Sequence, residues 1–275
     1  MLSYQHGYHA GNHADVLKHA TLCLCLEALG RKDSPYFLLD THAGAGLYDL
    51  QDAAARQTAE ADLGISRLWP KAAAALPQSY ASTLRQLNPK GPLRTYPGSC
   101  WLMAEALRPG DQAAFCERHP GEFEALEQNL ARRRGLALLH ADGYAQARAL
   151  LPPAAKRGLV LIDPSYETAQ DYSQVPKLVA DIHHRFRAAT VLVWYPLLSG
   201  AERLEAQLAR IGAGKADATV YSLDVGQIDS GMQGSAMYVL NPPWKLDEQL
   251  AACMDTIAPM LRQGDGAEFR AQSLG

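Results

Sequence analysis

The sequence predicts a three-layer α/β fold, in which a mainly parallel sheet lies between two layers of helices. Short apolar runs typical of buried strands alternate with longer segments of helical periodicity. The clearest run, residues 159–162, is apolar at every position, as expected for a parallel strand covered on both faces. Asp163 and Pro164 follow it and end the strand, because proline cannot continue a central strand.

Seven strands are expected, with helices between the early ones. The strands span residues 36–40, 112–117, 136–140, 159–162, 190–195, 218–223 and 236–240. The helices span residues 12–29, 99–107, 120–132, 144–150, 175–186 and 201–211, and Ser99 is the expected N-cap of its helix. No helix-length segment separates the last two strands, so we expect an antiparallel pair at one edge of the sheet.

Residues 50–95 are expected to form a small helical insertion. The strand that ends at Glu117 finishes 77 residues after Asp40, whereas a βαβ unit needs about 30. Residues 51–69 and 78–87 have helical patterns, with prolines between them. We therefore expect one domain made of residues 1–49 and 96–275, with residues 50–95 as a helical subdomain at the rim of the functional site.

Composition narrows the class of protein. The formal net charge of −3 excludes a uniformly basic nucleic-acid binder and leaves local basic patches open. The five cysteines are odd in number and scattered through apolar segments, which indicates reduced thiols rather than a disulfide framework. The first residues lack the apolar core of a signal peptide, and no long apolar run predicts a membrane span. We therefore expect a cytoplasmic protein.

The first nineteen residues contain four histidines: His6, His9, His13 and His19. A metal site is conceivable there, but no Cys, Asp or Glu completes a recognisable spacing of metal ligands. We therefore expect no metal.

Four acidic residues end predicted strands: Asp40, Glu117, Asp142 and Asp163. The carboxyl ends of parallel strands meet at the edge where open α/β sheets bind ligands. Each acid alone is as readily explained as a helix cap or turn residue. Together they suit a ligand that contains ribose and adenine.

The glycine turn after Asp40 favours S-adenosylmethionine over a nicotinamide cofactor. Gly44 and Gly46 permit close approach of the backbone to a ligand. The dinucleotide pattern G-x-G-x-x-G would need glycine where the chain has Asp49. The turn thus fits an adenosyl ligand that has no phosphate.

The segment Asp163-Pro164-Ser165-Tyr166 combines a carboxylate, a fixed carbonyl and an aromatic ring. This set suits a flat ring with an exocyclic amine, although a plain strand-ending turn is the better explanation of the tetrapeptide taken alone. Residues 241–244, Asn-Pro-Pro-Trp, are a competing match. They follow an antiparallel strand, so they should lie at the opposite edge. We interpret them as a rigid exit turn with Trp244 packed as a lid on the core.

These motifs identify a family resemblance over nearly the whole chain. The chain resembles the RlmJ family of 23S rRNA adenine-N6 methyltransferases. The similar segments are LSYQHGYHAGNHADVLKH, LDTHAGAGLY, YPGS, CERHP, HADGY, LIDPSY and NPPWKL. The resemblance implies a class I S-adenosylmethionine-dependent methyltransferase, with a Rossmann-like seven-stranded sheet whose last strand is antiparallel. It also implies 23S ribosomal RNA as partner, with no obligate protein partner evident.

The resemblance also implies roles for individual residues. Asp163, Pro164 and Tyr166 are the implied catalytic set, and Tyr4 is placed near the substrate RNA. The chain departs from the broader amine-methyltransferase pattern at Ser165, where a second proline is common. The implied cofactor-binding residues are His19, His42, Ser99, Glu117, Asp142 and Gly143. Lys18 matches the same N-terminal motif, and the glycine turn adds Gly44 to the expected cofactor site.

The expected mechanism of methyl transfer follows from the chemistry of the exocyclic N6 amine of adenine. The Asp163 carboxylate and the Pro164 carbonyl would accept hydrogen bonds from N6 and re-aim its lone pair, while Tyr166 stacks on the base. A DNA adenine methyltransferase and a non-catalytic binding protein remain alternatives. Candidate phosphate contacts are Arg31, Lys32, Lys90, Arg94 and residues 132–134.

Overall fold

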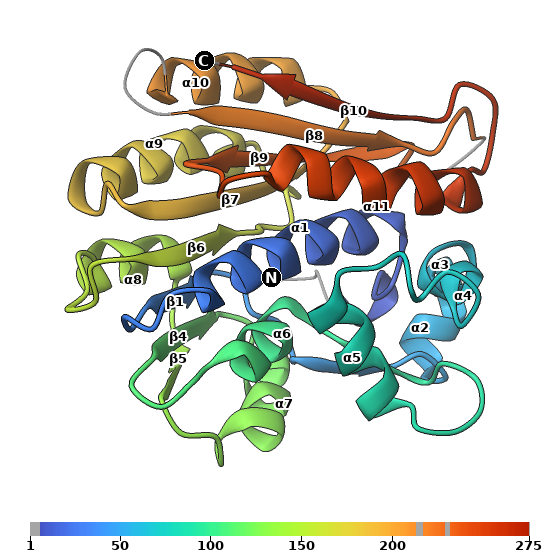
Figure 1. Ribbon diagram of the computed structural model, residues 1–275, viewed down its shortest axis with the longest axis horizontal. Coiled ribbons are helices and arrows are strands. Elements are labelled where there is room, and N and C mark those ends of the chain that lie inside the picture. Colours follow the sequence, from blue (N-terminus) through green and yellow to red (C-terminus); the bar gives the residue numbers. More distant parts are fainter. Residues whose placement is uncertain (1–5, 213–216, 229–231, 275) are drawn as a thin grey trace.

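The computed structural model describes residues 6–212, 217–228 and 232–274. Its main feature is an eight-stranded sheet with the order β10-β8-β9-β7-β6-β1-β4-β5, shown in Figure 1. The strands are β1 (Phe37–Asp40), β4 (Gln112–Glu117), β5 (Leu136–His140), β6 (Gly158–Ile162), β7 (Ala189–Pro196), β8 (Ala218–Asp224), β9 (Gly234–Leu240) and β10 (Glu268–Ser273). The predicted α/β class is confirmed.

Five neighbouring strands, β5, β4, β1, β6 and β7, run parallel, so their carboxyl ends share one edge. We call this the carboxyl edge, and the opposite one the amino edge. Strand β9 runs antiparallel to both β7 and β8, as expected for the last predicted strand.

The expected antiparallel pair is present as β8 and β9, with β9 between β7 and β8, but it does not lie at the edge of the sheet. The C-terminal strand β10 then covers β8 as an eighth strand. The sequence analysis missed β10, whose side chains are mostly exposed and give little apolar signal.

Helices cover both faces of the sheet (Figure 1). One buried cluster contains side chains of α1 (His13–Gly30), α6 (Ser99–Ala106), α7 (Pro120–Leu130) and α11 (Leu246–Leu261). The other contains side chains of α8 (Gly143–Leu150), α9 (Ala169–Arg185) and α10 (Ala201–Gly212). Helix α11 was not predicted; it returns the chain along the face that α1 occupies, and the two helices are in contact.

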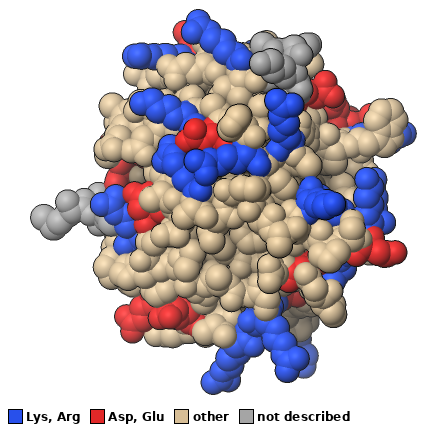
Figure 2. All heavy atoms as spheres, turned by 90° about the vertical axis from the view of Figure 1, so that its left-hand side faces the viewer, with Lys and Arg blue, Asp and Glu red and all other residues tan. Residues whose placement is uncertain are grey.

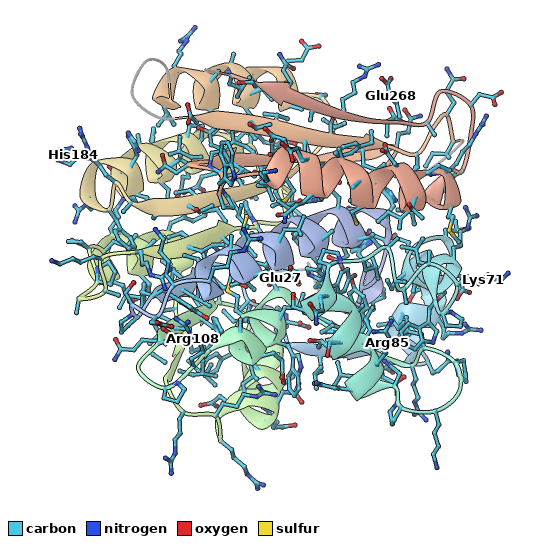
Figure 3. All side chains as sticks on the ribbon, viewed as in Figure 1. Glu27, Lys71, Arg85, Arg108, His184 and Glu268 are labelled. Atoms are coloured by element: carbon cyan, nitrogen blue, oxygen red, sulfur yellow. The ribbon has the colours of Figure 1, made fainter. Side chains whose placement is uncertain are left out.

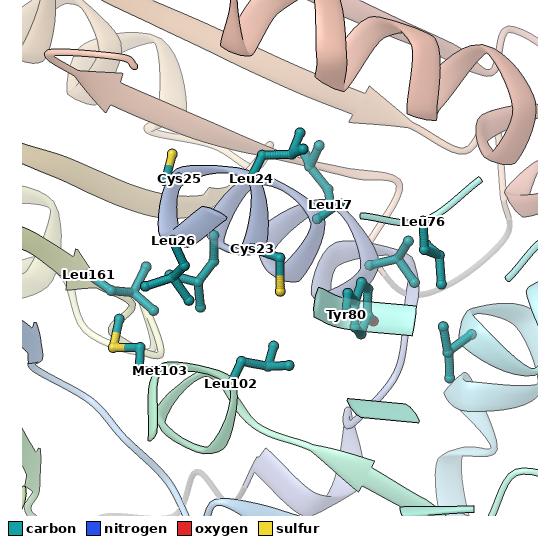
Figure 4. Close-up of a cluster of buried hydrophobic side chains, with 14 of the residues drawn as sticks. Leu17, Cys23, Leu24, Cys25, Leu26, Leu76, Tyr80, Leu102, Met103 and Leu161 are labelled. Carbon is teal, nitrogen blue, oxygen red and sulfur yellow. The ribbon is translucent and has the colours of Figure 1, made fainter. Parts of the chain in front are cut away.

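Helix α1 is the central helix of its layer. Every residue from His13 to Leu26 is buried, including five polar ones. Figure 4 shows side chains of this helix among those of other elements, such as Leu76, Met103 and Leu161. A helix buried on all sides belongs to a core. The polar residues of α1 must therefore find partners inside the protein.

Residues 50–95 contain four helices: α2 (Ala53–Thr58), α3 (Glu60–Leu63), α4 (Ile65–Leu68) and α5 (Gln78–Leu87). The strands β2 (Leu47–Asp49) and β3 (Thr95–Pro97), which precede and follow these helices in the chain, pair as a two-stranded antiparallel sheet. The single helix expected over residues 51–69 is thus three short ones. Ile65 and Tyr80 are fully buried in the cluster around α1. The subdomain boundary stays a prediction, since these helices share the main core.

Two local expectations are wrong. Gly98, not Ser99, is the N-cap of α6, because the Ser99 hydroxyl donates to Asp40 instead. Trp244 is 80% exposed and covers no core. It lies in a turn with positive φ at Asn241 and Lys245, a conformation uncommon for residues other than glycine.

The five cysteines are all free and buried, in agreement with the thiols expected from the sequence. Within the described ranges, no helix is long and apolar enough to cross a membrane. The same ranges contain no group of three or more His, Cys, Asp or Glu residues that could hold a metal ion.

Candidate active site at the carboxyl edge

A cavity of about 280 Å³ opens at the carboxyl edge, where β1, β4, β5 and β6 end. Most of the predicted site residues line it. They are Lys18, His42, Gly44, Ser99, Glu117, Asp142, Gly143, Asp163 and Pro164. They come from segments far apart in the chain, and the parallel strands bring them together because each delivers its last residue to the same edge.

The loop after β1 is held by the carboxylate of Glu117. Glu117 Oε2 accepts a hydrogen bond from the Gly44 amide at 2.8 Å, and Oε1 accepts one from the His119 amide at 2.6 Å. Gly44 has a φ of +61°, and a Cβ there would lie 2.2 Å from the Tyr48 hydroxyl oxygen. Only glycine fits this turn, which brings the backbone to the cavity wall.

Asp142 and Gly143 form the neighbouring wall. Asp142 is the N-cap of α8 and accepts from the Ala145 amide at 3.0 Å. Its side chain is 45% exposed, so part of it still faces the solvent. A Cβ on Gly143 would lie 1.9 Å from the Thr41 carbonyl oxygen, so only glycine lets these two loops approach. The capping alternative is therefore correct, and it coexists with a place on the cavity wall.

His42 lies on the wall between these loops. Burial lowers the pKa of its imidazole, although several surrounding carboxylates oppose the shift. Its Nδ1 is 2.8 Å from the Thr41 hydroxyl, and its ring packs edge-on against Tyr144. The side chain is thus a neutral, oriented ring rather than a cation near pH 7.

Asp40, at the end of β1, is a fully buried carboxyl group behind the cavity. Burial raises its pKa to about 7, although hydrogen bonds from the Ser99 hydroxyl and the His42 amide partly offset the effect. Ser99 lines the cavity, so Asp40 acts on the site through it.

The catalytic carboxylate predicted by the sequence has a buried cationic partner. Lys18 Nζ lies 2.6 Å from Asp163 Oδ2 and 2.8 Å from Asp15 Oδ1. Burial favours the neutral amine, but the two carboxylates outweigh it and raise the pKa of Lys18 above its ordinary value. Lys18 is therefore a permanent cation that fixes the Asp163 side chain.

Asp15 connects this pair to the N-terminal segment. Its Oδ2 is 2.9 Å from His6 Nε2 and accepts the Gly11 amide at 2.8 Å. Burial opposes ionisation, but His6, Lys18 and His19 hold the pKa of Asp15 well below its usual range. His6 also lines the cavity. Sequence reasoning missed Asp15 as a site residue, although its spacing of three from Lys18 on a helix could have indicated it.

Two of the predicted residues that the structure describes, His19 and Tyr166, are not on the cavity wall. His19 is fully buried, and its Nδ1 pairs with the Tyr96 hydroxyl at 2.8 Å. Tyr166 is 8% exposed and packs against Tyr172 and Trp194, so its ring faces the core and not the cavity. It has a φ of +54°. Tyr4 lies outside the described residues. The roles of all three stay predictions.

The sheet order, the antiparallel β9 and the cavity at the carboxyl edge define a class I methyltransferase. The glycine turn, the acids at the ends of β4 and β5 and the partly buried carboxylate after β6 are what that class needs for an adenosyl ligand and a reacting group. Residues 33–271 match the family model described as "Ribosomal RNA large subunit methyltransferase D, RlmJ". The chain belongs to this family, and the predicted family and enzyme class are confirmed.

Similar proteins agree with this assignment. The chain is 38% identical over 266 residues to Ribosomal RNA large subunit methyltransferase J of Escherichia coli (strain K12), covering 95% of this chain and 93% of the relative. It is 40% identical over 256 residues to the protein of the same name from Haemophilus influenzae, covering 91% and 90%. The crystal structure of LPL1258 from Legionella pneumophila is 32% identical, with a TM-score of 0.88 over 96% of this chain and 98% of that one.

Proposed function

We propose that the protein transfers the methyl group of S-adenosylmethionine to the exocyclic N6 of an adenine in 23S ribosomal RNA, in the cytoplasm. The observation that carries the proposal is the Asp163 carboxylate, fixed by buried Lys18 beside Pro164 on the wall of the cavity at the carboxyl edge. Family membership supports the rRNA substrate.

The cavity fits the adenosyl cofactor by its own geometry. Gly44 and Gly143 let the loops that line the cavity approach Tyr48 and Thr41 closely, and Glu117 and Asp142 offer carboxylate oxygens to hydroxyl and amine donors. His42 adds a neutral ring nitrogen without a repelling positive charge. When bound, the cofactor supplies an electrophilic methyl group on a sulfonium. The wall residues then need only to orient it.

Asp163 and Pro164 perform the substrate chemistry. Lys18 occupies Asp163 Oδ2, and none of the described donors contacts Oδ1. Oδ1 and the Pro164 carbonyl oxygen are therefore the acceptors for the two N–H groups of N6. Directing both hydrogens to acceptors turns the nitrogen lone pair away from the ring and toward the methyl group. Because Lys18 keeps its proton, the proton lost from N6 passes to the Asp163 carboxylate.

Target access requires the adenine to be unstacked. Tyr166 is the nearest aromatic ring in sequence to Asp163, so we propose that it stacks on the base after leaving its buried position. Its hydroxyl has no hydrogen-bond partner among the described residues, so no hydrogen bond from that group holds the ring in its buried position. Of the RNA contacts proposed in residues 50–95, Lys90 is exposed, whereas Arg94 is paired with Asp49 at 2.9 Å.

Methyl transfer with three acceptors tests the proposal. Labelled S-adenosylmethionine is incubated with the protein and protein-free 23S rRNA, 16S rRNA or duplex DNA, and the product is digested to nucleosides. We expect label in 23S rRNA as N6-methyladenosine. Label confined to DNA favours the DNA methyltransferase alternative. Label in another nucleoside contradicts the role given to Asp163 and Pro164.

A further inference from the structure

The amino edge of the sheet is strongly basic. Six fully described loops lie there, each entering a parallel strand or leaving β9: residues 31–36, 107–111, 131–135, 151–157, 186–188 and 241–245. Together they contain ten Lys or Arg residues and two Asp residues. Figure 2 faces the side of the molecule on which these loops lie in Figure 1, and Lys and Arg side chains spread across it. Figure 3 labels Arg108 on the same side.

Loop 31–36 has a fixed backbone and free cationic side chains. Arg157 donates to the carbonyl oxygens of Leu29 and Lys32, both at 2.7 Å, and Arg108 donates to that of Lys32 at 3.0 Å. The side chains of Arg31 and Lys32 are exposed and form no ion pair within the described part of the chain. The two inner arginines thus hold the loop while the two outer cations face the solvent.

An exposed tryptophan stands in the same surface. The Asn241 amide donates to the carbonyl oxygens of Arg187 at 2.9 Å and Ala189 at 2.8 Å, which fixes the turn that carries Trp244 against the loop that carries Arg187. Trp244 is 80% exposed, and the exposed Arg187 forms no ion pair with any described residue. An exposed ring beside unpaired cations is the combination that binds single-stranded nucleic acid, because bases stack on the ring and phosphates contact the cations.

The fully described loops of the carboxyl edge do not form such a surface. Its five fully described loops, residues 41–46, 118–119, 141–142, 163–168 and 197–200, contain one Arg and three Asp or Glu residues. These loops therefore offer an RNA backbone little positive charge. The two edges are about 18 Å apart, taking α1 from Lys18 to Gly30 at 1.5 Å per residue. A folded RNA is large enough to reach both.

We propose that the amino edge is a second RNA-binding surface, which holds the phosphodiester backbone of the substrate at a distance from the methylated nucleotide. This inference rests on the proposed function, because the RNA bound here is the substrate of the carboxyl edge. Lys32, Arg187 and the other exposed cations contact phosphates, and Trp244 stacks on an unpaired base. The surface supplies affinity, and the cavity supplies the chemistry.

Two matched double variants test the proposal. Lys32→Gln/Arg187→Gln removes one Lys and one Arg from the amino edge. Lys177→Gln/Arg203→Gln removes the same charges from exposed positions on α9 and α10, outside the six loops. Both are assayed with full-length 23S rRNA at several salt concentrations. The amino-edge variant should raise KM several-fold with kcat unchanged. It should also flatten the slope of log KM against log salt by about 1.5–2, whereas the control should match the wild type.

Trp244→Ala separates stacking from charge. It should weaken RNA binding about fivefold or more and leave the salt slope unchanged, because a base-stacking contact releases no counterions. The wild type, Trp244→Ala and Lys32→Gln/Arg187→Gln are also tested for sedimentation with vesicles of phosphatidylglycerol and phosphatidylcholine. Loss of vesicle binding with unchanged RNA kinetics overturns the proposal in favour of a membrane surface.

The outcomes distinguish this inference from the proposed function. An amino-edge variant with the KM and salt slope of the wild type overturns the second surface while methyl transfer itself stands. A wild-type protein that methylates no RNA overturns the proposed function, and the second surface with it. Equal effects in the test and control variants also overturn the surface, because they show a response to net charge alone.

Discussion

The two edges of one sheet hold charge in opposite ways. At the carboxyl edge, Lys18, Asp15 and Asp40 are each less than 5% exposed, and the first two are paired. At the amino edge, cations such as Lys32 and Arg187 are exposed and unpaired within the described residues. A buried charge needs a partner because desolvation costs several kcal/mol, whereas an exposed one does not. The carboxyl edge is therefore built to position groups, and the amino edge to attract a charged polymer.

The largest expected effect is on the rate of methyl transfer, and it separates the role of residues 163–166 from that of residues 241–244. Asp163→Asn removes the carboxylate that receives the proton from N6, so kcat should fall by about 10²–10⁴-fold, with cofactor affinity nearly unchanged. Asn241→Ala, at the amino edge, should keep the turnover of the wild type. Single-turnover methyl transfer and calorimetry measure the two quantities. A folded but inactive Asn241 variant beside an active Asp163 variant would reverse the assignment of the edges.

Removing the buried cation should destabilise the protein. Lys18→Met leaves the carboxylate of Asp15 buried without its nearest cation, which should cost about 3–5 kcal/mol in the free energy of unfolding. Lys32→Met at the amino edge should change it by less than about 0.5 kcal/mol. Urea denaturation measures both, and adding Asp15→Asn to Lys18→Met should recover part of the loss. Equal stability of the two single variants would show that Lys18 does not stabilise the fold by pairing with the buried carboxylate of Asp15.

The buried carboxyl of Asp40 predicts a pH dependence of stability. Its pKa is about 7 in the folded protein, against an ordinary value of 3.8. Its contribution to stability is therefore fully present below pH 4 and is lost as pH rises through 7. Relative to the wild type, Asp40→Asn should gain up to roughly 4 kcal/mol between pH 4 and pH 8.

Asp33→Asn is the control for this effect, because Asp33 is exposed at the amino edge. Its stability relative to the wild type should stay nearly constant over the same interval. Denaturation at pH 4, 5, 6, 7 and 8 measures both differences. A flat difference for Asp40→Asn would mean that Asp40 is already ionised in the folded protein.

The smallest expected effect is on the affinity for S-adenosylmethionine, through Glu117 on the cavity wall. Glu117→Gln weakens the charge-assisted hydrogen bonds that hold the Gly44 loop and meet the ligand, so S-adenosylmethionine should bind about 1.5–3 kcal/mol more weakly. Glu127→Gln, exposed on α7, should bind it as the wild type does. Calorimetric titration gives both affinities. If Glu117→Gln binds with wild-type affinity, the carboxyl edge does not hold the cofactor through this residue.

Local pattern predicted the elements whose signal is strong within one segment. The apolar runs of β4, β5 and β6, followed by acids, identified the parallel core of the sheet and its carboxyl edge, and α5 begins and ends where the pattern of residues 78–87 indicated. The mostly exposed strand β10 gave a weak apolar signal and was missed. Helix α11 was missed although its buried residues Leu246, Leu250, Cys253, Ile257 and Leu261 recur at helical spacing. The position of Trp244 was misjudged because an aromatic residue after a buried strand is usually buried as well.

By itself, the sequence determined the family, the α/β class and most of the residues gathered at one edge, because motifs and strand ends are local properties. Only the tertiary structure decided the partners of the charges. The pairing of Lys18 with Asp163 joins residues 145 apart in sequence, and the burial of Tyr166 depends on Tyr172 and Trp194. The basic amino edge is likewise spread over six loops that meet only in the folded sheet. Electrostatic interactions act through space, so their partners are set by the fold rather than by position in the chain.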